Sequence, residues 1–496
     1  MKSDFLKKYG FYISLSLFSL AYLVFMICFS GVRSLWYDDI YQIYFSWNRP
    51  LLDSLKTVLK VDLNPPLWAF ISYLWLKIAP YGTVWLKLPS MVMVAMSVFT
   101  VGLAGKEAFN KKIGAFAAFL FAMSPLVTLD CAYSFRAYGL YMFASTFIVY
   151  AYVKKLKDPN VKNRIIFAVA VFLIAFTHYF GALLCVFLGI SDLILAIVKK
   201  QPKSFFIEYV AVASVELLWF IPQLTTIGSA LSSFWPSRPT VLSYFKAFKV
   251  ILYDSWIAFA VFALAFLFFI YYIIITVKNK NGHSLLFDSK EYTKIIFILI
   301  PILYILLIFV YSNLKPESSV WVERYFFSLY PMLILFISVN MVEIGDRLLE
   351  RIKLSSIVNA SAVIILAAII TFNYSNTVIT KVKKEYEPFE QVAEFVMSQP
   401  EIKSGDDVLI INTTNCGVGW NYYLFKNNTV DMQNVHTMDL LSYSSSEILK
   451  HDVIFLYAVH FDGSFSLDEI REEISQTHYE EILDVKRNVY KYVRIK

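Results

Sequence analysis

The segment WYDDIYQIYFSWNRPLLDSLKTVLKVDLNPP, residues 36–66, places three carboxylates directly after a long apolar run that ends near Phe29. A second apolar run follows the segment. Because about 20 apolar residues are enough to cross a bilayer, we interpret both runs as membrane spans. Asp38, Asp39 and Asp62 are therefore predicted to lie at a membrane surface, where a cluster of acids requires an explanation.

The composition is typical of an integral membrane protein. Of the 496 residues, 58% are hydrophobic and only 17% are charged, which excludes a soluble domain of this size. The formal net charge is +7, but no basic tract indicates a nucleic-acid partner. The four cysteines lie far apart and form no ligand spacing with histidine, so we expect neither a disulfide framework nor a zinc site.

Apolar runs of this length recur along the first three quarters of the chain. The first run follows a short basic start and precedes no clear cleavage site, so we expect it to be retained as a helix. The pattern predicts an all-α polytopic membrane domain over residues 1–375. Its expected spans number about eleven and lie near 11–31, 84–104, 113–129, 137–153, 165–179, 181–198, 205–222, 255–277, 295–312, 325–342 and 356–375.

The distribution of Lys and Arg predicts the orientation. The N-terminus and the segments that would share its side all carry clustered cations, and such clusters are retained in the cytoplasm. The N-terminus is therefore expected in the cytoplasm. The first outer loop (32–83) and the tail from about 376 are expected on the opposite side of a cell membrane.

The tail differs in kind from the spans. It turns polar near Glu385 and alternates predicted helices with predicted strands, which indicates a small α/β extracytoplasmic domain over residues 376–496. We find no Gly-rich phosphate loop or metal motif in it, so we expect a recognition or structural role. Helices are predicted at 388–398, 417–426 and 466–475, and strands at 407–412, 452–458, 481–484 and 489–495.

The first outer loop has about 50 residues, and loops of that length usually have a function. Within it, 51–59 and 67–76 are apolar enough to form amphipathic helices in the membrane interface. Asp38 and Asp39 are adjacent, so their side chains must point in different directions. One acid can face a reacting group while the other orients the loop; the alternative is that both mark solvated chain after a span.

Three cations lie on the predicted outer side, although most Lys and Arg residues lie on the predicted cytoplasmic side. Lys87, Arg136 and Arg324 each lie near the start of a helix that runs inward. Helix N-termini bind anions, and a neighbouring cation strengthens such a site, so together they predict an anion pocket that holds a phosphate. Cations that snorkel from helix ends are the alternative. With such a pocket, Asp38 is placed to take a proton from an acceptor hydroxyl as the phosphate departs.

Several short motifs resemble one known family in both order and spacing. The family comprises the polytopic glycosyltransferases of the GT-C class that use a polyprenyl-phosphate sugar donor, the protein O-mannosyltransferase and aminoarabinose-transferase group. The motifs cover about two-thirds of the chain. They are Trp36-Tyr37-Asp38-Asp39, Asp62-x-Asn64-Pro65-Pro66-Leu67, Trp85-Leu86-Lys87-Leu88-Pro89-Ser90, Ser124-Pro125 with Ser134-Phe135-Arg136-Ala137-Tyr138, Thr177-His178-Tyr179 and Glu323-Arg324-Tyr325.

The resemblance implies an inverting sugar transfer at the outer face, with Asp38 as the catalytic acid or base and with Arg136 and Arg324 at the donor phosphate. Asp39 is the second catalytic candidate and stands where the family usually has Glu. Lys87, the third residue assigned to the donor phosphate, stands where the family often has Arg, which loses the bidentate fork. A third departure is Asn64 where the family has His.

Further residues are predicted to contact substrate. His178 lies at the outer end of a span, where polar residues often mark a substrate path, although it is as often a satisfied interface residue. Tyr138 is equally compatible with sugar stacking and with an interface position, Tyr325 follows the Arg324 motif, and Asp62 is expected to shape the floor of the site.

The reaction class leaves some partners open. No cofactor is required, no metal ligand is assigned, and a divalent ion held by the loop acids is left open. The acceptor is an unidentified lipid, polymer or protein that offers a hydroxyl or an amine. Two other functions are weighed: a flippase for a lipid-linked saccharide, which would show paired halves that this sequence lacks, and a non-catalytic scaffold.

Overall fold

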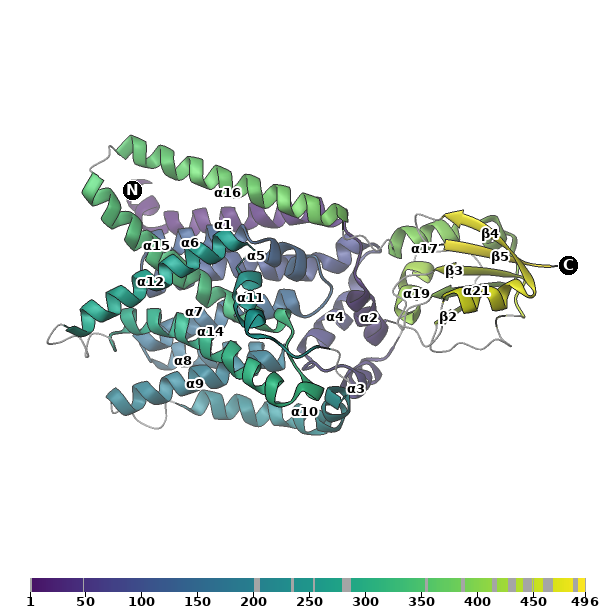
Figure 1. Cartoon of the computed structure of the whole chain (residues 1–496), viewed down its shortest axis with the longest axis horizontal. Coiled ribbons are helices and arrows are strands. Elements are labelled where there is room, and N and C mark those ends of the chain that lie inside the picture. The colour runs from purple at the N-terminus through teal and green to yellow at the C-terminus, as the bar shows by residue number, and fades with distance from the viewer. Residues whose placement is uncertain are drawn as a thin grey trace.

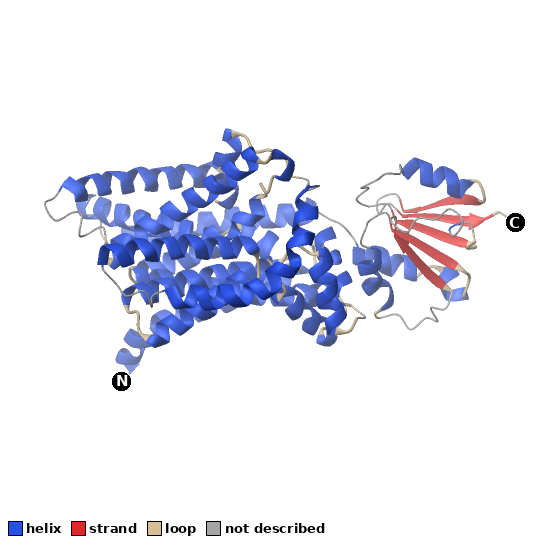
Figure 2. Ribbon diagram, turned by 90° about the horizontal axis from the view of Figure 1, so that it is seen from below, coloured by secondary structure: helices blue, strands red, loops and turns tan. Residues whose placement is uncertain are grey.

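The computed structural model describes residues 2–47, 49–199, 206–232, 236–252, 255–278, 287–352, 356–384, 389–412, 417–426, 434–439, 448, 450–457, 467–484 and 489–495. A bundle of long helices forms the larger part, and a sheet with its own helices lies beyond one end of that bundle (Figures 1 and 2). The N-terminus lies at the opposite end (Figure 1). The predicted all-α membrane domain with a small C-terminal α/β domain is confirmed.

The bundle is built from helices that run between its two ends. Its members are α1 (Lys2–Ser30), α5 (Thr83–Ala108), α6 (Lys111–Ala122), α7 (Tyr138–Lys157), α8 (Val161–Ala175), α9 (Tyr179–Lys199), α10 (Ile207–Ser232), α12 (Trp256–Lys278), α14 (Ser289–Leu314), α15 (Tyr330–Ile352) and α16 (Ser356–Lys384). Shorter elements join them: the π-helical turn η1 (Val127–Ala132), the helix α11 (Val241–Ile251) and the 3-10 turns η3 (Pro316–Ser318) and η4 (Glu323–Leu329).

Seven helices among the described residues are long and apolar enough to cross a membrane. They coincide with seven of the eleven expected spans: α1, α5, α9, α10, α12, α14 and the continuous segment of η4 and α15. The other four expected spans correspond to α6, α7, α8 and α16. Two of these are short, since α6 has 12 residues and α8 has 15.

The outward faces of the spans expose large apolar side chains. Leu218 on α10 and Ile257 on α12 are 76% and 79% exposed. Surfaces of this kind are stable against lipid tails and not against water. The chain is a multi-pass membrane protein.

The basic segments meet at the N-terminal end of the bundle. The Lys111 ammonium donates to the Lys7 carbonyl at 3.3 Å, and Lys112 pairs with Asp346 at the end of α15. Lys157 contacts Glu107 across the same end. These contacts place the cation-rich segments around Lys7, Lys111 and Lys157 on one side, at the end far from the sheet (Figure 1).

The first outer loop folds into three helices at the other end of the bundle: α2 (Tyr37–Ser46), α3 (Leu51–Val61) and α4 (Leu67–Ile78) (Figure 1). The predicted helices 51–59 and 67–76 are confirmed as α3 and α4. Helix α2 was not predicted, because its two acids and polar residues break the apolar pattern. Asp38 and Asp39 therefore lie in the first turn of a helix, where carboxylates are stabilised by the helix dipole.

The C-terminal domain contains one five-stranded sheet in the order β2-β1-β3-β5-β4. Strands β1 (Val408–Asn412), β2 (Val435–Asp439) and β3 (Val453–Tyr457) are parallel. Strand β5 (Val489–Arg494) pairs antiparallel with β3, and β4 (His478–Asp484) pairs antiparallel with β5. Four of the strands were predicted. Strand β2 was missed because its sequence, VHTMD, is too polar to show an apolar alternation.

Helices cover this sheet and connect it to the outer loop. They are α17 (Phe389–Met397), α18 (Pro400–Ser404), α19 (Gly417–Phe425) and α21 (Leu467–Ser475). Residues from α2, α4, α17 and α19 share one buried apolar cluster. The Lys426 ammonium donates to the Ala79 carbonyl at 2.7 Å, and the hydroxyls of Thr83 and Tyr423 are 2.8 Å apart. The sheet domain thus rests on the helices of the outer loop.

Glycine allows a close contact between α5 and α6. A Cβ atom at Gly114 of α6 would lie 2.4 Å from the Gly102 carbonyl oxygen and 2.7 Å from the Lys106 nitrogen, both on α5. Both are backbone atoms, which cannot move aside as a flexible side chain would. Small residues permit such close approach of membrane helices.

We expect Gly114→Ala to lower the melting temperature of the detergent-solubilised protein, because the added methyl group must separate α5 from α6 at a cost of about 1–3 kcal/mol. Gly228→Ala on α10 is the matched control, since its Cβ atom meets nothing within 4 Å. Thermal unfolding of the two variants beside the unmodified chain provides the measurement. Equal melting temperatures for the two variants would contradict the close contact.

Candidate functional site

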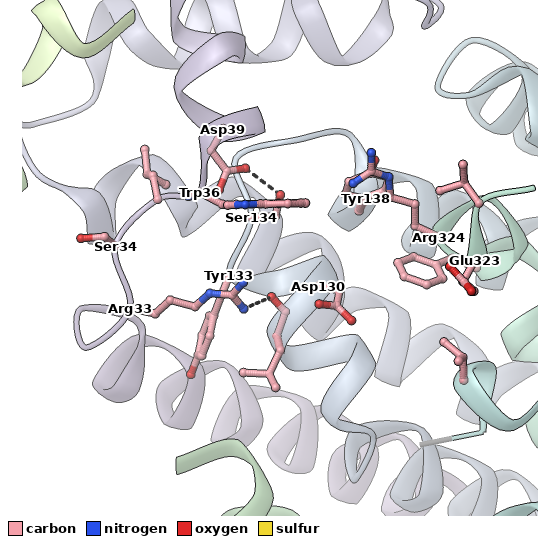
Figure 3. A pocket seen from close by; sticks show the side chains of 15 residues that line it. Arg33, Ser34, Trp36, Asp39, Asp130, Tyr133, Ser134, Tyr138, Glu323 and Arg324 are labelled. Atoms are coloured by element: carbon pink, nitrogen blue, oxygen red, sulfur yellow. Dashed lines mark hydrogen bonds between the residues drawn. The ribbon is translucent and has the colours of Figure 1, made fainter. Parts of the chain in front are cut away.

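The Asp39 carboxylate joins the outer loop to the start of α7. Its Oδ1 atom accepts a hydrogen bond from the Ser134 hydroxyl at 2.7 Å (Figure 3) and a second one from the Phe135 backbone N–H, also at 2.7 Å. Its Oδ2 atom accepts the Trp36 backbone N–H at 3.0 Å. The side chain is 1% exposed, and this burial raises the pKa of Asp39 while the hydrogen bonds act in the opposite direction. Asp39 thus positions the chain before Arg136, and both of its oxygens already accept hydrogen bonds within the protein.

Asp38 points away from this network. Its Oδ2 atom pairs with the Arg324 guanidinium at 3.2 Å, and both side chains are about one-quarter exposed. The Arg324 guanidinium also lies over the rings of Trp36 and Tyr138, with its central carbon 5.6 and 5.8 Å from their centroids. The two adjacent acids therefore have different environments, as their positions in one helical turn require.

Arg136 faces the same region from the start of α7. Its Nη2 atom lies 3.8 Å from Asp62 Oδ1, a distance that gives attraction without a short hydrogen bond. The same Asp62 oxygen already accepts the Leu63 backbone N–H at 2.8 Å and the Asn64 side-chain amide at 2.9 Å. Asp62 therefore shapes the Asp62–Pro66 turn below Arg136.

Both arginines retain unused donors. In the part of the chain that the structure describes, Arg136 Nη1 and Arg324 Nε are buried and have no hydrogen-bond partner. A buried guanidinium N–H without a partner is costly, and an anion that accepts it removes the cost. The two unused donors therefore favour a site for an anionic ligand.

Two cavities have Arg324 and Tyr138 in common among their lining residues. The first, which we name the Arg136 cavity, has a volume of about 580 Å³, and the second, the Arg33 cavity, has about 620 Å³. Side chains that line the Arg136 cavity include Asp38, Asp62, Asn64, Arg136, Tyr138, His178, Arg324 and Tyr325. Side chains that line the Arg33 cavity include Arg33, Trp36, Asp39, Asp130, Tyr133, Ser134, Tyr138, Glu323 and Arg324 (Figure 3).

Aromatic rings form one wall of the Arg136 cavity. The His178 imidazole stacks on Tyr141 with ring centroids 4.8 Å apart, and Tyr325 lies 5.2 Å from it. The Phe180 N–H donates to His178 Nδ1 at 3.3 Å, so this nitrogen carries no proton and the neutral ring has its proton on Nε2.

Lys87 is not placed with the two arginines. Its side chain is fully buried, and its ammonium donates to the carbonyl oxygens of Ser30, at 2.9 Å, and of Arg33. It also lies over the Tyr133 ring. Lys87 is not among the described residues that line either cavity, so its observed contacts stabilise the carboxyl end of α1.

The three loop acids do not converge on one point. Asp38 faces Arg324, Asp39 faces the turn before α7, and Asp62 faces its own turn. Among the described residues, they do not form a group of side chains close enough to share a metal ion.

Sequence reasoning missed several residues of the Arg33 cavity. Arg33 itself follows the first span on the outer side, so the charge criterion that selected Lys87 would have found it. Its guanidinium donates to the Leu129 carbonyl at 3.0 Å. Asp130 had no comparable signal, because a single acid between two spans is common in any loop. Glu323 was part of the Glu323-Arg324-Tyr325 motif but was given no role of its own.

Comparisons with known proteins support this fold. No family model matches the chain, and no curated protein matches its sequence. The crystal structure of ArnT from Cupriavidus metallidurans bound to undecaprenyl phosphate is similar, with a TM-score of 0.58, 11% sequence identity and coverage of 98% of each chain. The apo state of the same protein gives a TM-score of 0.56 at 12% identity, with 99% of this chain and 98% of that chain covered.

A more distant similarity extends to the oligosaccharyltransferase of Archaeoglobus fulgidus crystallised with a tethered acceptor peptide. Its TM-score is 0.45 at 10% identity, and the match covers 99% of this chain and 75% of that chain. At the level of the fold, the resemblance to the GT-C class drawn from the sequence motifs is confirmed by the ArnT structures.

The adjacent acids should differ in what they contribute to stability. We expect Asp39→Asn to lower the free energy of unfolding by about 1–3 kcal/mol, because the amide group of Asn must face one of the three N–H and O–H donors. Asp38→Asn removes one partly exposed ion pair and should cost less than about 1 kcal/mol. Melting temperatures of the two variants provide the test. A less stable Asp38→Asn than Asp39→Asn would overturn the assigned roles.

Proposed function

We propose that this chain is a membrane glycosyltransferase that moves one sugar from a polyprenyl-phosphate donor to an acceptor at the outer face of a cell membrane. The observation that carries the proposal is the pair of buried, unpartnered guanidinium donors of Arg136 and Arg324 in one cavity beside the Asp38 carboxylate. The similarity to a protein crystallised with undecaprenyl phosphate adds support.

The donor phosphate occupies the Arg136 cavity in this proposal. Arg136 Nη1 and Arg324 Nε supply the hydrogen bonds, and two positive charges balance the phosphate and the Asp38 carboxylate. A volume of about 580 Å³ lies within the range of small-molecule sites and admits one sugar with its phosphate. Tyr138, Tyr325 and the neutral His178 supply ring faces and an N–H donor for the sugar.

The reaction is a single displacement with inversion. An acceptor oxygen or nitrogen attacks the anomeric carbon, and the bond from that carbon to the phosphate oxygen breaks with its electron pair. Asp38 takes the acceptor proton, while Arg136 and Arg324 stabilise the polyprenyl phosphate that leaves. No metal ion is needed for the charge balance, because the two arginines already neutralise the leaving group.

The acceptor enters from the Arg33 cavity. This cavity meets the donor site at Arg324 and Tyr138, and its lining combines Arg33 with the acids Asp130 and Glu323. Its mixed charges suit a polar acceptor group of a lipid, a polymer or a protein. The cation-rich end of the bundle faces the cytoplasm, and the loop helices and the sheet domain lie outside.

Asp38→Asn should reduce transfer from a labelled polyprenyl-phosphate sugar by about 10²–10⁴-fold, because it removes the general base and preserves the size of the side chain. The assay uses unmodified protein and variant reconstituted in vesicles, with donor affinity measured in parallel. Donor affinity should not fall, because the loss of the Asp38–Arg324 ion pair leaves Arg324 available to the phosphate. Unchanged transfer by a folded Asp38→Asn would remove Asp38 from the reaction.

The same vesicles test the flippase alternative. A flippase moves the labelled donor between leaflets without forming product, whereas the proposed enzyme forms glycosylated acceptor. Movement of the donor without product formation, across a series of candidate acceptors, would favour the flippase.

Arg136→Ala should weaken donor binding by about 10- to 100-fold, the effect of losing one or two charge-assisted hydrogen bonds to phosphate. Arg33→Ala is the matched control, because Arg33 lines the other cavity and should affect acceptor binding instead. Titration of each variant with the lipid phosphate alone measures its donor affinity. Equal donor affinities for the two variants would contradict the assignment of the cavities.

A further inference from the structure

Three potential metal ligands meet at the amino ends of three strands of the C-terminal sheet. In the described part of the chain, none of them lines either cavity. Asp407 directly precedes β1, His436 is the second residue of β2, and His451 lies two residues before β3. In the parallel pairing, Val408 lies opposite both Val435 and Val453. The amino ends of three neighbouring strands therefore bring these side chains together.

One carboxylate oxygen is faced by both imidazole rings. Asp407 Oδ1 lies 3.0 Å from His451 Nδ1 and 3.4 Å from His436 Nε2, and the three ligand atoms all lie within 4.8 Å of one another. In tetrahedral zinc sites with bonds of about 2.0–2.2 Å, ligand atoms are about 3.3–3.5 Å apart. The observed spacing needs only small side-chain rotations to match that geometry.

The two histidines present suitable atoms. His451 is 5% exposed and its Nε2 atom is buried without a hydrogen-bond partner in the described chain, so the ring offers Nδ1 to the cluster. The side chains of Asp407 and His436 are 40% and 50% exposed. One side of the cluster therefore opens to solvent, which gives a metal ion an entry path and a water ligand at the fourth position.

We propose that Asp407, His436 and His451 bind one Zn²⁺ ion or a similar divalent transition metal, which fastens the edge strand β2 to β1 and β3. Two imidazoles and one carboxylate are ligands that suit Zn²⁺. Strand β2 lies at the edge of the sheet, next to β1. An ion bound by all three residues would link β2 to its neighbours in addition to the backbone hydrogen bonds. We therefore expect the ion to raise the stability of the C-terminal domain.

The test uses the full-length protein in detergent, stripped of metal with a chelator and titrated with Zn²⁺ by calorimetry. The unmodified chain should bind one ion, and both His436→Gln and Asp407→Asn should weaken that binding by about tenfold or more. Asp452→Asn is the matched control, because this exposed acid lies beside His451 in the sequence and pairs with Arg494 instead.

A second readout separates the specific site from adventitious binding. Zn²⁺ should raise the melting temperature of the unmodified chain and of Asp452→Asn, but not that of His436→Gln. Since His436 is half exposed, its substitution should leave the fold intact. The proposal is overturned if the unmodified chain binds no stoichiometric Zn²⁺, or if His436→Gln binds it with unchanged affinity.

Discussion

The buried carboxylate of Asp39 is the interaction on which the proposed site depends. It accepts hydrogen bonds from the start of α2 and from the turn before α7, two segments about 95 residues apart in the chain. A carboxylate with three donors in a water-poor site has one favourable orientation, so it fixes both segments relative to each other. Asp38 directly precedes Asp39, and Arg136 directly follows Phe135. The hydrogen bonds of Asp39 therefore set the distance between Asp38 and Arg136.

Arg324 then connects the two cavities. It pairs with Asp38 on the side of the Arg136 cavity and also lines the Arg33 cavity with Tyr138. Without a ligand, the Asp38 carboxylate offsets its charge. A phosphate that engages Arg324 and Arg136 would compete with this ion pair and leave Asp38 available to a proton donor, which links donor binding to the proposed base.

The sequence predicted the architecture better than it predicted the contacts between side chains. Long apolar runs, clustered cations and the alternation in the tail were sufficient for the membrane bundle and the small α/β domain, because each leaves a periodic or compositional pattern. Helix α2 and strand β2 were missed because short polar elements show neither an apolar periodicity nor a distinctive composition. Arg136 and Arg324 were predicted to share a pocket and do line one cavity, whereas Lys87 satisfies backbone carbonyls, a role that depends on packing alone.

The most direct measurement is a structure of the full chain with polyprenyl phosphate. We predict that the phosphate lies in the Arg136 cavity, with oxygens within hydrogen-bond distance, about 2.7–3.2 Å, of Arg136 Nη1 and Arg324 Nε, and that the Asp38 carboxylate lies beside it. A phosphate bound in the Arg33 cavity, or one that contacts neither guanidinium group, would contradict the account.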